Sequence, residues 1–138
     1  MSQLVVDASM TIAWLFADER TEAAHAVMMR VASGGAVVPS LWRLEVANVL
    51  RNAVRRGRCD QSYVDRSLER LGRFPVAVDD ETDLRAWRET LRLSRDHGLT
   101  VYDAAYLELA VRKSGPLATC DTALGAAAAR CGLEVFTA

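Results

Sequence analysis

Leu4-Val5-Val6-Asp7-Ala8-Ser9 is the stretch of sequence that decides the fold. Three apolar residues, two of them β-branched, run directly into one aspartate and two small residues. A continuous apolar run is typical of a strand buried on both faces of a parallel sheet, so Asp7 is predicted at the carboxyl end of the first strand. Ser9 is predicted to cap the helix that follows. Because ligands bind at the carboxyl ends of strands in open α/β sheets, Asp7 is the first candidate for a functional site.

The rest of the chain repeats this alternation of short apolar runs and helical segments. Further strands are predicted at residues 36–38, 74–78, 117–120 and 134–136. The helices between them have these expected N-caps: Asp18, Ser40, Asp60, Asp80, Thr100 and Asp121. Residues 80–98 are predicted to form one long helix. Strands alternating with helices predict an α/β fold with a parallel sheet, and the absence of a linker or repeat predicts a single domain over residues 1–138.

Composition limits the class of protein. The 138 residues are 51% hydrophobic and 25% charged, which is ordinary for a globular domain. The net charge of -1 gives no overall basic field, although all cationic residues but Lys113 are arginine. Three cysteines without a C-x-x-C pair fit a reducing compartment. No secretion signal and no 18-residue apolar run occur, so we expect a cytoplasmic protein without membrane association.

Four acidic residues do not fit an ordinary solvated surface. Asp7 and Asp121 each follow a predicted strand, and Asp103 lies three residues after Thr100 in a pattern like a capping box. Taken singly, each of these three also fits a helix cap. Glu45 shares a narrow polar helix stripe with Asn48 and Asn52, which taken alone could be a wet surface.

The predicted fold brings the four acids to one rim of the sheet. Asp7 and Asp121 lie at carboxyl ends of strands, Asp103 opens the helix that leads into the fourth strand, and Glu45 is in the first turns of the helix leaving the second. Two such charges about 4 Å apart repel by about 4 kcal/mol at an effective dielectric constant near 20. An all-oxygen cluster without a nearby Lys or Arg favours Mg²⁺ or Mn²⁺. Such an ion activates water for attack on phosphorus, so the pattern predicts phosphodiester hydrolysis.

With these motifs the chain resembles the PIN-domain nucleases, and among them the small VapC-type toxins of bacterial toxin–antitoxin pairs. The resemblance covers residues 1–138. It rests on the following segments: Val6-Asp7-Ala8-Ser9, Pro39-Ser40-Leu41-Trp42 with Glu45 and Asn48, Leu99 to Tyr106 with Asp103, and Thr119-Cys120-Asp121.

The resemblance implies a fold, an activity and a set of site residues. The fold is a three-layer α/β/α sandwich whose parallel five-stranded sheet has the order 3-2-1-4-5, which places Asp7 beside Asp121. The activity is that of an endoribonuclease dependent on Mg²⁺ or Mn²⁺, with RNA as substrate and a small antitoxin as partner. A homodimer is expected on another ground, the large apolar residues on the first two helices, because two-fold dimers are the commonest assembly. The implied catalytic residues are Asp7, Glu45, Asp103 and Asp121, with Asp7, Asp103 and Asp121 as metal ligands and Ser9, Asn48 and Thr119 in support.

Two other folds with acidic sites do not fit the sequence, and one alternative within the PIN family does. The sequence lacks the two adjacent acids after the first strand that a receiver domain has. It also lacks the Asp-x-Asp pattern of a dehalogenase-like phosphatase, because Ser9 stands in place of the second aspartate. The main alternative is a catalytically silent PIN module that binds RNA or protein, which loss of one of the four acids would favour; none is lost. An arginine cluster near residues 51–58 is either a solvated helix end or an RNA-backbone track. Large apolar residues on the first two helices are expected to form a partner surface: Trp14, Leu15, Phe16, Met28 and Met29. Trp14, Trp42 and Trp87 lie at helical spacing with aliphatic residues, so each of them fits either the core or a dimer contact.

Overall fold

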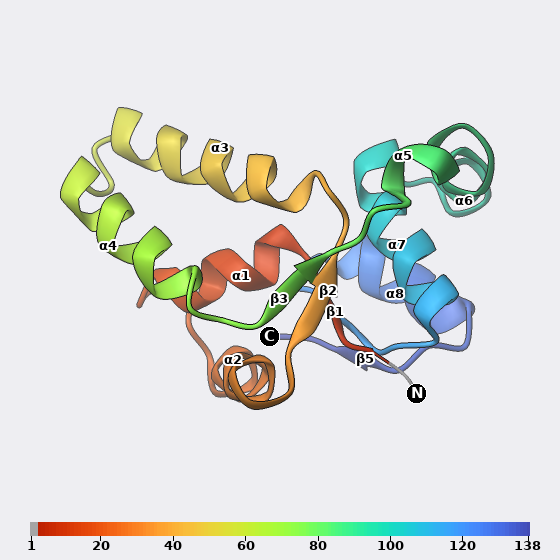
Figure 1. Ribbon diagram of the computed structural model, residues 1–138, viewed down its shortest axis with the longest axis horizontal. Coiled ribbons are helices and arrows are strands. Elements are labelled where there is room, and N and C mark those ends of the chain that lie inside the picture. The colour runs from red at the N-terminus through yellow and green to blue at the C-terminus, as the bar shows by residue number, and fades with distance from the viewer. Residues whose placement is uncertain (1–2) are drawn as a thin grey trace.

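A five-stranded parallel sheet lies between two groups of helices in the computed structural model, which describes residues 3–138 (Figure 1). The strands are β1 (Val5–Val6), β2 (Ala36–Val38), β3 (Val76–Val78), β4 (Leu117–Ala118) and β5 (Val135–Phe136). Their order is β3-β2-β1-β4-β5, and every neighbouring pair is parallel. The predicted order is therefore confirmed, and β1 lies beside β4.

The helices divide into an N-terminal and a C-terminal group. They are α1 (Ala8–Leu15), α2 (Glu22–Gly34), α3 (Trp42–Arg55), α4 (Gln61–Leu71), α5 (Thr82–Arg85), the π-helix η1 (Ala86–Thr90), α6 (Leu91–His97), α7 (Val101–Lys113) and α8 (Thr122–Arg130). In Figure 1, α1 to α4 lie on one side of the strands and α5 to α8 on the other. This division follows from right-handed crossovers, because the chain moves from β1 towards β3 and then returns to β4. None of the helices within residues 3–138 has both the length and the apolarity that crossing a bilayer requires.

The residues predicted as N-caps of the first and second helices are not the observed caps. Asp7, not Ser9, caps α1, because its Oδ1 accepts a hydrogen bond from the backbone N–H of Met10 at 2.9 Å. The Ser9 hydroxyl instead donates to the Asp7 carboxylate at 2.8 Å. The second helix begins after Thr21, whose hydroxyl caps it, and not after Asp18. In both helices the residue expected as the cap lies two or three residues from the true cap.

Two further starts differ, and three are confirmed. Helix α3 begins after Leu41 without a side-chain cap, so Ser40 is not the N-cap. The segment predicted as one long helix from Asp80 begins at Thr82 and is helical without a break to His97, as α5, a π-helical turn and α6. The predicted caps of α4, α7 and α8 are confirmed: Asp60, Thr100 and Asp121.

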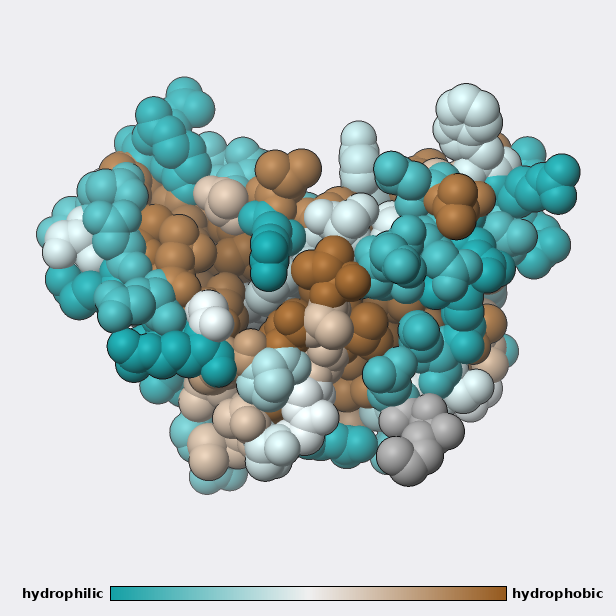
Figure 2. All heavy atoms as spheres, in the orientation of Figure 1, coloured by the Kyte–Doolittle hydropathy of each residue, from teal (hydrophilic) through white to brown (hydrophobic). Residues whose placement is uncertain are grey.

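The core is centred on β1, β4 and the helices that cover them. Helix α1 is buried from Met10 to Leu15, because α2 and α3 pack against it. Trp14, Leu15 and Phe16 are therefore core residues. This is the core alternative for Trp14, and the expectation of an exposed partner surface on α1 is wrong. Met29 is exposed, as that prediction requires. Other exposed apolar side chains lie on the C-terminal helices, where Trp87 is 91% exposed. In Figure 2 the larger hydrophobic areas, in brown, lie between α3 and α4 and over the strands, and a smaller one lies near α5 and α6.

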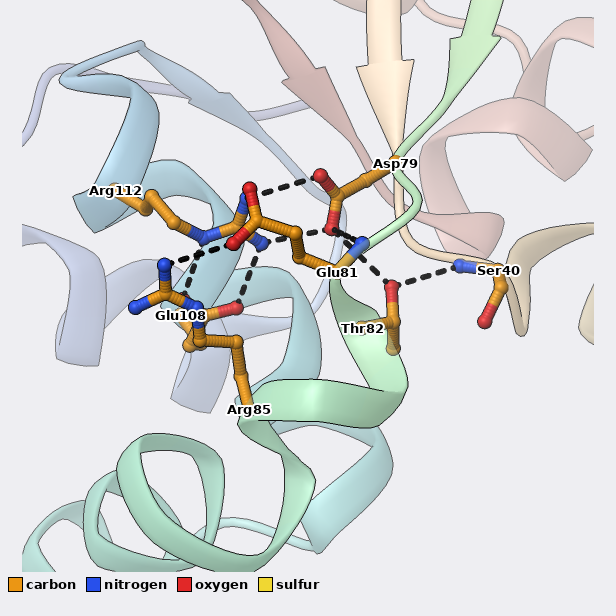
Figure 3. Close-up of polar contacts among 7 residues, drawn as sticks. All are labelled: Ser40, Asp79, Glu81, Thr82, Arg85, Glu108 and Arg112. Carbon is orange, nitrogen blue, oxygen red and sulfur yellow. Dashed lines mark hydrogen bonds and ion pairs between the residues drawn. The ribbon is translucent and has the colours of Figure 1, made fainter.

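A buried ionic network fixes α7 against the end of β3, as Figure 3 shows. The guanidinium of Arg112 makes two hydrogen bonds to Asp79, of 2.9 and 2.7 Å, and two more to Glu108 on its own helix. Asp79 also accepts from the hydroxyl of Thr82, which in turn accepts from the backbone N–H of Ser40 at 3.1 Å. The network therefore connects α7, the exit of β3 and the entrance to α3.

Candidate active site

The four predicted acids line one cavity of about 370 Å³ at the carboxyl edge of the sheet. They come from four separate segments: Asp7 from the junction of β1 and α1, Glu45 from α3, Asp103 from α7 and Asp121 from the junction of β4 and α8. Within the described residues, no Lys or Arg lines this cavity. The parallel order of β1 and β4 accounts for the meeting of Asp7 and Asp121, since carboxyl ends of parallel strands share one edge.

Asp7 is the most buried of these acids, with 4% of its surface exposed. Its carboxylate accepts hydrogen bonds from the backbone N–H of Met10 at 2.9 Å, the Thr119 hydroxyl at 2.5 Å and the Ser9 hydroxyl at 2.8 Å. Burial nevertheless raises the pKa of Asp7 from 3.8 to about 6, because removal from water outweighs these donors, and the charge of Asp103 adds to the rise. The fold holds a carboxylate in place while making its negative charge costly.

Two hydroxyls connect Asp7 to the turn that carries Asp121. The Thr119 hydroxyl donates to Asp7 and accepts from the backbone N–H of Asp121 at 2.9 Å. The Ser9 hydroxyl likewise donates to Asp7 and accepts from the backbone N–H of Cys120 at 3.0 Å. Each hydroxyl uses its single proton on the carboxylate and its lone pairs on the turn. Both residues thus support the site geometrically, and Thr119 is completely buried.

Asp103 and Glu45 face the cavity from the two helix groups. Thr100 caps α7 by accepting from the backbone N–H of Asp103, so the Asp103 carboxylate is not used as a cap. Burial, together with the charge of Asp121, raises the pKa of Asp103. Burial also raises the pKa of Glu45, and the charge of Asp103 contributes to that rise. Each raised pKa therefore reflects both desolvation and a neighbouring carboxylate.

Two lining residues with hydrogen-bonded or ion-paired side chains, Tyr106 and Glu19, were not predicted as site residues. Tyr106 lies on α7 and its hydroxyl donates to Glu45 Oε1 at 2.5 Å. Its spacing of three residues from Asp103 places both on one helix face, a signal that could have found it. Glu19 also lines the cavity, and its carboxylate is paired with Arg58 at 2.7 Å. Asn48, which was expected to support the site, is exposed and is not among the described residues that line the cavity.

The donor set of this cavity fits a hard divalent cation. It offers carboxylate oxygens, its acids have raised pKa values, and no cationic side chain within the described residues lines it to neutralise them. Three acidic oxygens come within 4.8 Å of one another elsewhere, at Asp79, Asp80 and Glu81. That second cluster is already neutralised, because Arg112 pairs with Asp79 and Arg85 pairs with Glu81. Among the described residues, the cavity acids form no group of three with carboxylate oxygens within 4.8 Å of one another.

Comparison with known proteins agrees with this fold. The PIN domain family matches residues 4–130. The chain is 34% identical over 122 residues to a protein of Pyrobaculum aerophilum named Ribonuclease VapC3, a match that covers 88% of this chain and 92% of that protein. It is also similar to the crystal structure of PAE2754 from Pyrobaculum aerophilum, with a TM-score of 0.71 and 29% sequence identity over 98% of this chain and 84% of the other.

Proposed function

The chain belongs to the PIN-domain family, and from this we propose that it is a VapC-type endoribonuclease that hydrolyses phosphodiester bonds of RNA with a divalent metal ion, Mg²⁺ or Mn²⁺. The observation that carries the proposal is the single cavity lined by four carboxylates and, within the described residues, by no Lys or Arg. A silent binding module would have no need to keep four costly acids in one cavity, so the catalytic interpretation is favoured over the non-catalytic one.

The chain's own residues take distinct parts in this proposal. Asp7, Asp103 and Asp121 would hold the ion, since they are short side chains fixed close to the backbone. A divalent ion supplies a charge that polarises a phosphoryl oxygen and lowers the pKa of the attacking water. Glu45, with its raised pKa, is suited to accept a proton from that water at its Oε2, because Oε1 already accepts from Tyr106. Ser9 and Thr119 keep Asp7 oriented towards the cavity.

The test is an RNA cleavage assay with purified protein. We expect cleavage of single-stranded RNA in the presence of Mg²⁺ or Mn²⁺, no cleavage in excess chelator, and recovery when the ion is returned. Asp7→Asn and Asp103→Asn should abolish cleavage while both variants remain folded by circular dichroism. Asp96→Asn is the matched control, since Asp96 is an exposed aspartate away from the cavity. Cleavage that continues unchanged in chelator refutes the metal-dependent mechanism.

A toxin role is proposed with this activity. A small antitoxin protein would silence the chain, most simply by placing an Arg or Lys side chain among the four acids in place of the ion. Expression of the chain alone should then arrest growth of a bacterial host, and Asp7→Asn should relieve the arrest. Undisturbed growth alongside demonstrated nuclease activity would instead favour a role in RNA processing.

A homodimer is the proposed assembly, and its surface differs from the one expected at first. Leu84, Trp87 and Leu91 follow one another at helical spacing along α5, η1 and α6, and all three are exposed, Trp87 and Leu84 most of all. A large apolar side chain with almost all of its surface in water is typical of a partner contact. Two-fold dimers are the commonest assembly, so we assign this surface to a second copy of the chain.

A further inference from the structure

The hydrogen bond between Tyr106 and Glu45 joins the two helix groups across the cavity. Tyr106 is on α7 and Glu45 is on α3, and their side chains meet with a distance of 2.5 Å between the phenolic oxygen and Oε1. Tyr106 is 1% exposed, so its hydroxyl is withdrawn from water. A buried hydroxyl needs a partner, and the carboxylate supplies it.

The direction of this hydrogen bond is fixed. Burial and the adjacent charge of Glu45 raise the pKa of Tyr106 far above its ordinary value, so the phenol keeps its proton. A phenol has one proton to donate, and here Glu45 Oε1 receives it. The other carboxylate oxygen, Oε2, makes no hydrogen bond to the described residues and remains available to the cavity.

Glu45 depends on this contact more than the other acids depend on theirs. Asp7 and Asp121 are short side chains, and each also accepts a backbone N–H at the start of a helix, from Met10 and Leu124. Glu45 has one more rotatable bond than aspartate, and among the described residues Tyr106 is its one hydrogen-bond partner. The nearby charge of Asp103 repels it, so without Tyr106 the side chain would gain both freedom and a reason to turn outwards.

We propose that Tyr106 is a positioning residue, which holds the Glu45 carboxylate in the cavity with Oε2 directed at the reacting groups. The proposal rests on the proposed nuclease function, because Glu45 is taken there as the group that receives a proton from water. Tyr106 itself touches neither RNA nor ion in this scheme and acts only through Glu45. Backbone N–H groups at helix N-termini fix the carboxylates of Asp7 and Asp121. For Glu45 the Tyr106 hydroxyl, from the opposite helix group, has the same function.

The experiment is a double-mutant cycle of Tyr106→Phe and Glu45→Gln, with Tyr102→Phe as matched control. The first change removes one oxygen atom, and Tyr102 is an exposed tyrosine on the same helix that does not line the cavity. We expect Tyr106→Phe to lower kcat for RNA cleavage about 10- to 100-fold, the worth of a hydrogen bond to a charged group, with KM changed less than about twofold. The double variant should be no slower than Glu45→Gln alone, and Tyr102→Phe should cleave like the wild type.

A second readout does not depend on cleavage. Binding of Mn²⁺ to the same variants is measured by electron paramagnetic resonance. Glu45→Gln should weaken affinity because it removes one of the four negative charges of the cavity, although Glu45 is not assigned as a ligand. Tyr106→Phe should weaken affinity in the same direction, and the double variant should bind no more weakly than Glu45→Gln. The proposal is overturned if Tyr106→Phe changes neither kcat nor affinity, or if its effects add in full to those of Glu45→Gln. If wild-type protein cleaves no RNA, the nuclease function fails, and the cycle in Mn²⁺ affinity still decides the part played by Tyr106.

Discussion

Replacement of Asp7 by asparagine should stabilise the metal-free protein at neutral pH. The pKa of Asp7 is raised from 3.8 to about 6, so its ionised form costs the folded state about 3 kcal/mol, at about 1.4 kcal/mol for each pKa unit. Asparagine removes that cost and can still accept the backbone N–H of Met10. Its amide group must find acceptors at Thr119 and Ser9, which costs about 1–2 kcal/mol. The net expectation for Asp7→Asn is a gain of about 1–2 kcal/mol, or a Tm about 5 °C higher.

The sign of the pH dependence follows from the same shift. An acid whose pKa is higher in the folded state binds its proton more tightly there, so the wild type regains stability as the pH falls from about 6 towards 3.8. The advantage of Asp7→Asn should therefore shrink by about 2 kcal/mol between pH 7.5 and pH 4.5. Asp96→Asn, at an exposed position, should stay within about 0.5 kcal/mol of the wild type.

The assay is urea unfolding in excess chelator at both pH values, followed by circular dichroism. The reasoning is refuted if Asp7→Asn is the less stable protein by 1 kcal/mol or more at pH 7.5, or if its advantage does not diminish on acidification. Addition of Mn²⁺ should reverse the order at pH 7.5, because an ion that binds only the folded wild type raises its stability by mass action.

Three further changes test the fold and the surface. Arg112→Met should cost about 3–5 kcal/mol of stability at neutral pH, because it leaves Asp79 charged and buried, and the loss should shrink as acid protonates that carboxylate, which urea titrations at pH 7 and pH 4 would show. Gly115→Ala should destabilise the protein by about 2 kcal/mol or more, measured by thermal unfolding, since a Cβ there would lie 1.5 Å from the backbone oxygen of Gln3. Trp87→Ser should shift sedimentation from dimer to monomer with little change in Tm; an unchanged dimer refutes the assigned surface.

The pattern of apolar runs predicted the sheet well, because strands buried on both faces leave a simple signal. The runs at Val5-Val6 and Leu117-Ala118 carry no polar residue, and they are the two central neighbours of the sheet. Once the order of elements was known, the meeting of Asp7 with Asp121 followed from topology alone. The gathering of the four acids was therefore predictable, since it depends on strand ends and helix starts and not on side-chain detail.

Side-chain contacts, both local and long-range, were harder to predict from the sequence than the sheet. The sequence offers Asp7 and Ser9 as rival caps, and geometry decides between them because the Ser9 hydroxyl is used on the Asp7 carboxylate. The sequence left Trp14 open as a core residue or a dimer contact, because burial of α1 depends on α2 and α3 packing over it. The bond from Tyr106 to Glu45 spans 61 positions of sequence, a separation at which no periodicity reports contact.

The double use of Asp7 and Asp121 as site acids and helix caps restricts how the chain can evolve away from activity. Asparagine is the replacement that removes the charge and keeps the cap, and one transition in the first codon position converts an aspartate codon into an asparagine codon. Lineages that escape a harmful nuclease would thus accumulate asparagine at these two positions. Asp103 carries no such restriction, because Thr100 caps its helix, so there inactivating substitutions would be diverse. The kinds of substitution found at each acid in inactive relatives would therefore distinguish the acids that also cap a helix from those that do not.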